Sequence, residues 1–588
     1  MDILFVTPTD TLKLNSVSNG TMLLGTKLLQ AGFTVDVVRF GQFSSYKEDY
    51  ELFISDITRH ILEANPKCVS FYTLWPYYHI SLRIAHEIKH LNNEIIVVFG
   101  GPQSSATAEE TLKTFATVDY VCTGEGENTV VPFFSAILRD SVSDLSSIPG
   151  LCYRQGGEIV RNTQDITLCN LNELPHWSQQ LITTWDPHEE EDIHTNHYFM
   201  PIDAGRGCPY SCTYCSTSNF WRRTYRLKSA EKIMDDILYY YNEYGITSFM
   251  FSHDAFTSNQ KLVAEVCDKI INENINITWS CSTRIDCLTE DLICKMVQSG
   301  LKSINVGIET GSPRMQKVIN KRLNLEYAKK MVAFLQEQKL SVVLFFMYGF
   351  PEETEEDLNQ TLELLFNFLD QGVTRATLSF LHFSPATQIT IDNLDKLTLD
   401  ANYRIVFRGI FGWQNEMEMI KSNKTIFSNF YNLRTDLREK YQNLFYLEYI
   451  YDKYRTSMQF FRKYYRGDNL AFFAAFQNHI ASLLNQGRVR GDRIKHGVIE
   501  IINNTLNDID KPFVKQLKSL FSFEHDITEI KSSDTDCSIR KVYDFCYLDF
   551  MEMIPIEDFS EYKTELLIQK KDGRFSVEVL DITPFEAL

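Results

Sequence analysis

The chain has 588 residues, which is too long for a single hydrophobic core, so we expect several domains. Its composition, with 44% hydrophobic residues and a net charge of −19, is that of a globular protein and argues against nucleic-acid binding as its main role. No apolar run reaches the roughly 18 residues that span a bilayer. The first residues read directly as a strand without a signal peptide, and the 13 cysteines are unevenly spread. We therefore expect a cytoplasmic protein with reduced cysteines and no membrane partner.

Residues 1 to 140 alternate short apolar runs with amphipathic helices. The predicted strands are Ile3–Thr7, Val35–Phe40, Cys68–Tyr72, Ile95–Phe99 and Asp119–Cys122. Apolar strands between helices predict an α/β fold with a doubly wound parallel sheet, whose ligands bind over the carboxyl ends of the strands. Two glycine-rich loops, at Gly100-Gly101-Pro102 and Gly124-Glu125-Gly126-Glu127, follow two of these strands. They are either tight turns or parts of a ligand site.

The remaining residues divide into three predicted parts. Residues 141 to 195 form a connector with one small hairpin across Gly156 and Gly157. Residues 196 to 395 return to βα alternation, and repeated right-handed units of this kind close toward a partial (β/α)6 barrel. The predicted barrel strands are Tyr198–Ile202, Ser248–Phe251, Ile277–Ser280, Ser303–Ile308, Val342–Phe346 and Ala376–Phe380. Residues 396 to 588 form an accessory region that is mainly helical, including Asn429 to Tyr464, and ends in a β-hairpin around Lys571-Asp572-Gly573.

Three cysteines, Cys208, Cys212 and Cys215, follow the first barrel strand with the spacing C-x3-C-x2-C. Thiolates hold iron in iron–sulfur clusters, and three ligands for a cubane of four irons would leave one iron open. A zinc knuckle, a disulfide framework and buried thiols are the alternatives. C-x3-C is less usual for zinc than C-x2-C, and no histidine follows within thirty residues. The spacing therefore favours a cluster with a reactive iron.

With Tyr214 before its last cysteine, this motif resembles the signature of the radical S-adenosylmethionine (SAM) enzymes. The resemblance implies a 4Fe-4S cluster on Cys208, Cys212 and Cys215 whose open iron chelates SAM. It also implies reductive cleavage of SAM to a 5'-deoxyadenosyl radical, with electrons from an external donor of the flavodoxin or ferredoxin type. Cys267, Cys281, Cys287 and Cys294 are predicted to be structural thiols.

Polar residues at the ends of three barrel strands resemble the SAM-binding positions of that family. Asp254 follows the second strand, Arg284 the third, and Glu309 ends the fourth. A carboxylate can pair with the amino group or ribose hydroxyls of SAM, and an arginine fork suits its carboxylate. Exposed salt bridges are the alternative use of such side chains.

The first 140 residues resemble the cobalamin-binding module that precedes many radical SAM domains. The resemblance implies a cobalamin site lined by Tyr72, Thr73, Gly100, Gly101, Gly124, Glu125 and Gly126. One feature departs from the mutase families, which carry Asp-x-His-x-x-Gly after the first strand. This chain reads Thr7-Pro8-Thr9-Asp10-Thr11 there, so we expect no histidine ligand to cobalt. His79, His86 and His90 are predicted to be helix or surface residues.

These resemblances imply a cobalamin-dependent radical SAM enzyme, and we expect a C-methyltransferase acting on an unactivated carbon of a peptide or natural product. Two alternatives stay open. One is a radical SAM cyclase, rearranging or oxidising enzyme without net methylation. The other is a non-catalytic binding protein that responds to cobalamin or SAM.

Overall fold

The chain forms two compact units in a computed structural model. The first unit comprises Met1–Gly307, Gln316–Val342 and His382–Arg434, and the second comprises Ile308–Met315, Val343–Leu381 and Thr435–Leu588. The structure describes residues 1–9, 18–139, 144–162, 168–182, 200–399, 410–466, 468–485, 493–509, 511, 513–533, 537–543, 545, 562–571 and 574–584.

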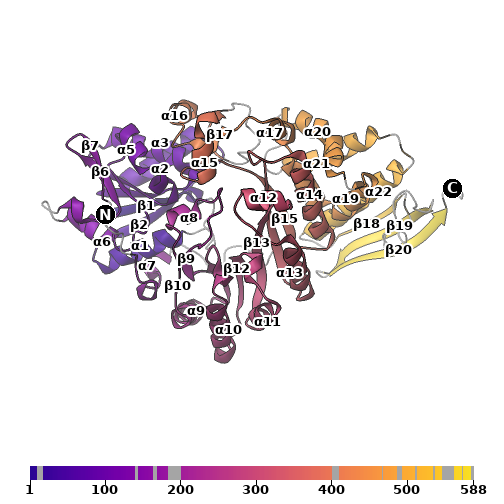
Figure 1. Cartoon of the computed structure of the whole chain (residues 1–588), viewed down its shortest axis with the longest axis horizontal. Helices are drawn as coiled ribbons and strands as arrows, with labels where there is room; N and C mark the ends of the chain where they lie inside the picture. The colour runs from indigo at the N-terminus through magenta and orange to yellow at the C-terminus, as the bar shows by residue number, and fades with distance from the viewer. Residues whose placement is uncertain are drawn as a thin grey trace. The chain divides into compact units, whose positions relative to one another are not determined.

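A seven-stranded sheet opens the first unit, in the order β2-β1-β3-β4-β5-β6-β7 (Figure 1). Its strands are β1 (Ile3–Thr7), β2 (Val35–Arg39), β3 (Cys68–Tyr72), β4 (Ile96–Gly100), β5 (Tyr120–Cys122), β6 (Leu151–Gln155) and β7 (Glu158–Arg161). The first five strands pair in parallel, as predicted. Their order is that of a flavodoxin-like sheet, whose ligand crevice lies where the strand order reverses, between β1 and β3.

Helices flank this sheet (Figure 1). They are α1 (Asn19–Gln30), α2 (Tyr50–Glu63), α3 (Tyr78–Leu91), α4 (Pro102–Ala106), α5 (Ala108–Thr114) and α6 (Val130–Leu138), with α7 (Gln179–Ile182) following the sheet. The hairpin predicted across Gly156 and Gly157 is present as β6 and β7. It joins the sheet instead of standing apart from it, because β6 pairs with the outer edge of β5 in the antiparallel sense. Such pairing satisfies backbone groups that an open sheet edge would leave exposed.

The barrel strands of the first unit are also parallel neighbours, in the order β13-β12-β11-β8. They are β8 (Met200–Asp203), β11 (Ser248–Ser252), β12 (Thr278–Thr283) and β13 (Leu301–Glu309), and β13 ends in the second unit. Tyr198 and Phe199, predicted to begin the first of them, lie outside the described residues. The helices between and after them are α9 (Ala230–Tyr244), α10 (Gln260–Glu273), α11 (Glu290–Gln298), α12 (Pro313–Val318) and α13 (Leu325–Glu337).

Smaller elements of the first unit surround these strands. They are β9 (Gly205–Gly207), α8 (Thr217–Phe220), β10 (Tyr225–Leu227), α15 (Gln388–Asn393), β16 (Thr398–Leu399), α16 (Met417–Ser422) and β17 (Tyr431–Asn432). The strand β17 interrupts the helical stretch predicted from Asn429, because its two residues pair with β16. That predicted helical region therefore begins only at Asp436.

The last two barrel strands, β14 (Ser341–Tyr348) and β15 (Arg375–Phe380), pair in parallel around α14 (Glu355–Asp370), and from Val343 onward these elements belong to the second unit. Thr354 and Asp357 form a capping box at the start of α14, each side chain accepting the backbone N–H of the other residue. The six predicted strands of the partial (β/α)6 barrel are thus all present. Strand and helix alternate through them as the sequence pattern predicts.

The C-terminal region of the second unit is mainly helical, as predicted. Its helices are α17 (Asp436–Tyr441), α18 (Phe445–Lys453), α19 (Arg455–Tyr464), α20 (Asn469–Asn485), α21 (Arg493–Asn507) and α22 (Val514–Ser532). The predicted hairpin is formed by β19 (Tyr562–Lys571) and β20 (Arg574–Pro584), and β18 (Cys537–Tyr543) adds a third antiparallel strand that the sequence pattern did not reveal.

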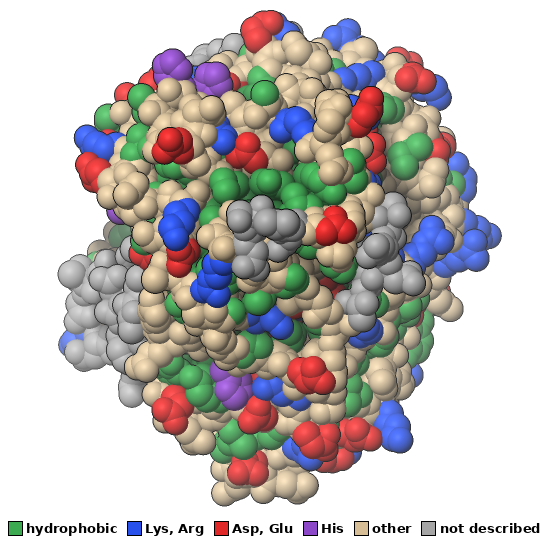
Figure 2. Space-filling model, turned by 90° about the vertical axis from the view of Figure 1, so that its left-hand side faces the viewer, with side chains coloured by type: hydrophobic (Ala, Val, Ile, Leu, Met, Phe, Trp, Pro, Cys, Tyr) green, Lys and Arg blue, Asp and Glu red, His purple; other side chains and the backbone are tan. Residues whose placement is uncertain are grey.

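Two further observations concern the charges on the surface and the length of the helices. On the face that Figure 2 shows, acidic and basic side chains are interspersed. Among the described residues, no helix combines the length and the apolar character that crossing a membrane requires.

Candidate functional site

The three cysteines of the C-x3-C-x2-C motif lie in one loop between β9 and α8, after the carboxyl end of β8. Each of the three side chains is half-buried, and none forms a disulfide. Backbone hydrogen bonds hold the loop at Thr213, whose N–H donates to Ile319 O (3.1 Å) and whose carbonyl accepts from Ile389 N (3.0 Å). The loop is therefore fixed by two other segments of the first unit.

The strand β9, which precedes these cysteines and pairs with β10 after them, requires glycine. Gly207 has φ +84°, and a Cβ atom there would lie 2.0 Å from the carbonyl oxygen of Thr224. A Cβ on Gly205 would lie 2.4 Å from the carbonyl oxygen of Arg226. Only glycine permits this close pairing of β9 with β10 directly ahead of Cys208.

The cysteine thiols influence one another electrostatically. Burial raises the pKa of Cys208 to about 11, and the nearby thiols of Cys215 and Cys212 and the carboxylate of Asp254 act in the same direction. Burial also raises the pKa of Cys212, although Lys321 and Arg284 oppose that effect. Because thiolates are the ligands, binding a metal ion through these cysteines would release their protons.

Arg284, predicted to bind SAM, follows β12 and lies beside the cysteine loop. Its Nε and Nη2 atoms donate to the carboxylate of Asp286 (3.0 and 2.8 Å), and Nη2 also donates to the carbonyl of Lys321 (2.8 Å). Its Nη1 atom lies 4.0 Å from Cys212 Sγ, and its guanidinium covers the ring of Tyr210. Most donors of Arg284 are thus already used within the protein, next to the cysteines.

The predicted structural thiols are buried or half-buried. Cys267 and Cys281 are fully buried, Cys287 is 7% exposed, and Cys294 is half-buried. Cys287 still touches the cysteine loop, because the hydroxyl of Tyr210 lies 3.1 Å from its Sγ atom. The sequence pattern gave no sign of that contact.

A cavity of about 760 Å³ in the first unit brings the two predicted cofactor regions together. On its barrel side lie Asp203 at the end of β8, His253 and Asp254 after β11, and Ser216 and Thr217, which directly follow Cys215. Asp254 is accessible to solvent through this cavity, but the surrounding protein desolvates its carboxylate and raises its pKa. Asp254 therefore faces the space next to the cysteine loop.

The opposite side of this cavity is formed by the strand ends of the N-terminal sheet. Six of the seven predicted cobalamin residues line it: Tyr72, Gly100, Gly101, Gly124, Glu125 and Gly126. Gly101 has φ +103°, and a Cβ atom there would lie 2.9 Å from the carbonyl oxygen of Thr73, so the loop approaches the cavity with bare backbone. A broad, flat ligand lying against backbone fits this surface.

Thr73 is the exception among these residues. Its side chain is fully buried, and Oγ1 donates to the carbonyl of Gly100 (2.8 Å) and contacts the hydroxyl of Ser104 (2.9 Å). Thr73 does not line the cavity but supports the Gly100-Gly101 loop from behind. The resemblance placed it on the surface of the site because it belongs to the loop after the third strand.

His79, the buried histidine of α3, is not among the residues that line the cavity. Its Nε2 atom lies 2.8 Å from the carbonyl oxygen of Phe411, and its ring packs edge-on against Phe430. Burial lowers the pKa of His79 to about 4. His79 thus attaches the segment around Phe411 to α3, whereas His86 and His90 are exposed.

The second unit contains the remaining predicted SAM residue and a loop after β14. Glu309 is 7% exposed and has φ 69°, an unusual conformation for a residue with a side chain. In the loop, Glu353 accepts the N–H groups of Gly349 (2.5 Å) and Phe350 (3.3 Å), and burial raises the pKa of Glu353 to about 8. The buried Arg438 of α17 donates to the carbonyl of Gly349 and so holds this loop from the C-terminal region.

Family models match the two regions that form this cavity. A model of the radical SAM superfamily matches residues 202–365, and a model of the B12 binding domain matches residues 9–133. The chain contains a radical SAM domain and a B12-binding domain. A radical SAM domain uses a 4Fe-4S cluster and SAM, and a B12-binding domain binds cobalamin, so this is a cobalamin-dependent radical SAM enzyme.

Curated relatives of this radical SAM enzyme include methyltransferases and cyclases. The chain is 28% identical over 313 residues to the uncharacterized methyltransferase PH0819 of Pyrococcus horikoshii, which covers 53% of this chain and 67% of that protein. It is 23% identical over 341 residues to the anaerobic magnesium-protoporphyrin IX monomethyl ester cyclase of Rubrivivax gelatinosus, covering 57% of this chain and 60% of the cyclase. The chain therefore spans about two thirds or less of the length of these relatives.

Solved structures share the fold of this enzyme. The radical SAM methyltransferase TsrM from Kitasatospora setae, with cobalamin and a 4Fe-4S cluster bound, has a TM-score of 0.53 at 17% identity, covering 67% of this chain and 75% of TsrM. The cobalamin-dependent radical SAM enzyme OxsB, with aqua-cobalamin and SAM bound, has a TM-score of 0.54 at 15% identity, covering 91% of this chain and 74% of OxsB. At these identities the likeness is one of fold.

Proposed function

We propose that this enzyme is a cobalamin-dependent methyltransferase that adds a methyl group to an unactivated carbon of a peptide or small natural product. The observation that carries the proposal is the shared cavity. It is lined by the strand ends of the B12-binding domain on one side and by Ser216, Thr217 and Asp254 beside the cysteine loop on the other. A methyl donor and a radical generator would meet there.

In this proposal Cys208, Cys212 and Cys215 hold the 4Fe-4S cluster. Asp254, Arg284 and Glu309 contribute to binding SAM, each from the carboxyl end of a barrel strand. Because Arg284 is already paired with Asp286 and packed on Tyr210, its contribution is to fix the cysteine loop and to present Nη1, which lies 4.0 Å from Cys212 Sγ. Asp254 is the side chain best placed to receive a cationic group in the cavity.

Cobalamin would lie against the Gly100-Gly101 and Gly124–Gly126 loops, with Tyr72 beside it. The chemistry that the bound cofactors supply is hydrogen abstraction by a carbon radical and delivery of a methyl group. The protein supplies the positions of the reacting groups and excludes water from the cavity. Electrons would come from an external donor of the flavodoxin or ferredoxin type.

A second candidate function has support from the relatives. Three curated relatives carry the name anaerobic magnesium-protoporphyrin IX monomethyl ester cyclase, at 23 to 25% identity. The same two domains could therefore serve a cyclisation or oxidation without net methylation.

Mass spectrometry of the product separates the two. The reaction would be run anaerobically with a chemical reductant, hydroxocobalamin, candidate substrates and SAM whose methyl group is deuterated. A product that gains one deuterated methyl group supports the methyltransferase. A product that loses hydrogen and carries no deuterium supports the cyclase or oxidase, and contradicts our first proposal.

A further inference from the structure

The short ribbon of β9 and β10, whose strands lie on either side of the cysteine loop in the chain, carries two arginines opposite each other. In the antiparallel pairing of β9 with β10, Arg206 is the register partner of Arg226. Like charges directly opposite on a ribbon destabilise it. The ribbon that leads into Cys208 therefore needs nearby anions to form.

Those anions come from the loop that lines the cobalamin side of the cavity. Arg206 pairs with Glu127 (2.6 Å) and Glu125 (3.5 Å), and also with Asp203 (3.0 Å) at the end of β8. Arg226 pairs with Glu125 through its Nη2 atom. Glu125 and Glu127 belong to the Gly124-Glu125-Gly126-Glu127 loop of the B12-binding domain, so the two cofactor loops are joined by ion pairs.

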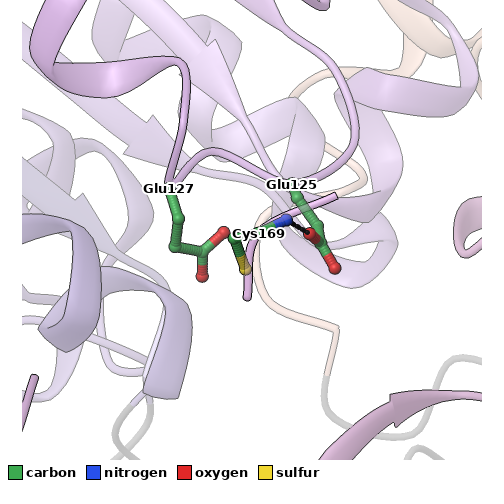
Figure 3. Close-up of side chains that lie close together, drawn as sticks. All are labelled: Glu125, Glu127 and Cys169. Carbon is green, nitrogen blue, oxygen red and sulfur yellow. Dashed lines mark hydrogen bonds between the residues drawn. The ribbon is translucent and has the colours of Figure 1, made fainter. Parts of the chain in front are cut away.

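Cys169 completes the group. Its backbone N–H donates to Glu125 (3.1 Å), its carbonyl accepts from Arg226 (2.9 Å), and its thiol lies 3.7 Å from a guanidinium nitrogen of Arg206. Figure 3 shows the side chains of Glu125, Glu127 and Cys169 close together, with the hydrogen bond from the Cys169 backbone to Glu125 drawn.

A cation site is the alternative use of these three residues, since one ligand atom from each lies within 4.8 Å of the others. However, the two guanidinium groups already supply the positive charge that a bound cation would bring. Arg206 contacts both carboxylates, and Arg226 contacts one of them. We therefore interpret the group as an ion-pair network and not as a metal site.

These ion pairs are buried, so the loss of one partner is costly to the folded protein. The side chains of Arg206, Glu125 and Glu127 are 8%, 3% and 4% exposed. Burial opposes ionisation of Glu127, but Arg206 holds its pKa below the usual value, so the carboxylate stays charged. Removing one partner of a buried pair leaves an uncompensated charge, whereas replacing both with neutral groups of similar size is far less disruptive.

We propose that Arg206 and Arg226 are positioning residues that couple cobalamin binding to cluster binding. A ligand that orders the Gly124–Glu127 loop fixes the carboxylates, and the carboxylates fix the ribbon that places Cys208. The proposal rests on the cofactor positions proposed above but not on methyl transfer. Because coupling between two sites is reciprocal, a bound cluster must then tighten the binding of cobalamin.

The test measures the affinity of the full-length protein for hydroxocobalamin by absorbance titration, once without iron and once with the cluster reconstituted. We expect the cluster to tighten cobalamin binding by about 5-fold or more in the natural protein. In the double variant Arg206→Met/Glu127→Gln, which removes one positive and one negative charge together, we expect the ratio of the two affinities to fall, while the pair of Arg226 with Glu125 stays in place.

The matched control is Lys228→Met/Asp236→Asn. This pair is equally buried, at 4% and 6% exposed with 2.7 Å between its charged atoms, but it joins β10 to α9 and does not touch the Gly124–Glu127 loop. This control variant should show the same ratio of cobalamin affinities, with and without the cluster, as the natural protein. Arg206→Lys serves as a second variant should the double variant fold poorly, because it keeps the charge but loses the fork that reaches two carboxylates.

Three outcomes would overturn the proposal in different ways. Equal affinities in the natural protein would show that no coupling exists. A natural ratio in both Arg206 variants would show coupling through another route. No uptake of cobalamin in either state would remove the proposed cobalamin site as well, and so would be distinguishable from a failure of the coupling alone.

Discussion

The guanidinium of Arg284 lies over the ring of Tyr210, with its Cζ atom 3.7 Å from the ring centroid. Tyr210 stands between the first two cysteines of the motif, and Arg284 directly follows the third barrel strand, β12. A strand end and the cysteine loop are thus packed together through a cation and an aromatic face. This contact places Arg284 beside the cysteine loop, which its position in the sequence did not predict.

We expect Arg284→Lys to weaken the cluster more than it weakens SAM binding. Lysine cannot pair with Asp286 through two nitrogens while it covers Tyr210, so the cysteine loop loses its support. Residues that orient metal ligands typically cost about 10-fold to 100-fold in metal affinity when changed. Iron retained after a challenge with a chelator is the measurement, and Asp286→Asn should behave alike. Normal iron retention with a raised KM for SAM would instead support direct binding of the SAM carboxylate.

Replacing Cys208, Cys212 or Cys215 by alanine should abolish reductive cleavage of SAM, because a cubane held by three thiolates does not survive with two. The measurement is 5'-deoxyadenosine formed with dithionite, together with the iron content. Cys281→Ser is the control, since this thiol is fully buried and should leave both quantities unchanged. Undiminished 5'-deoxyadenosine from the Cys212→Ala protein would refute the assignment, as would loss of iron from Cys281→Ser.

Bound cobalamin should lack a protein imidazole beneath the metal. Among the described residues that line the cavity, His253 is the one histidine, and it comes from the barrel side. The paramagnetic resonance spectrum of bound cob(II)alamin should therefore show no nitrogen superhyperfine splitting. His79→Leu should leave that spectrum unchanged, because His79 does not reach the cavity. Nitrogen splitting that disappears in a His253→Gln variant would contradict this prediction.

The docking of the segment around Phe411 should weaken in mild acid. The pKa of His79 is lowered by burial from 6.5 to about 4, so the unfolded or undocked chain binds more protons than the native one between these values. Stability therefore rises with pH through this window and is lost as the pH falls from 6.5 toward 4. The expected loss between pH 7 and 5 is about 2 kcal/mol.

Hydrogen exchange of the backbone amides near Phe411 and Phe430 measures this effect. Natural protein and His79→Leu would be compared at the same pH, so that the intrinsic exchange rates cancel. The natural protein should lose protection at pH 5 relative to pH 7, and the variant should not show this change. An equal pH response in both proteins would show that another group titrates.

The sequence by itself determined most of the secondary structure and the identity of the cofactor regions. Apolar runs between amphipathic helices correctly predicted β1 to β5 and the six barrel strands, because side-chain period and burial are local properties of the chain. The spacing of Cys208, Cys212 and Cys215 is likewise local, so its chemistry can be read without coordinates. The two glycine-rich loops were also found from the sequence, because glycine marks places where the backbone must turn or lie bare.

Only the tertiary structure decided which residues meet. Thr73 and Tyr72 are neighbours in the chain, yet Tyr72 lines the cavity and Thr73 is buried behind it, because successive residues after a strand point in different directions. Arg206 and Glu127 lie 79 positions apart and are joined by an ion pair that no local pattern records. Long-range pairs of this kind depend on how the strands are ordered in space, and a charged side chain in a sequence carries no mark of its future partner.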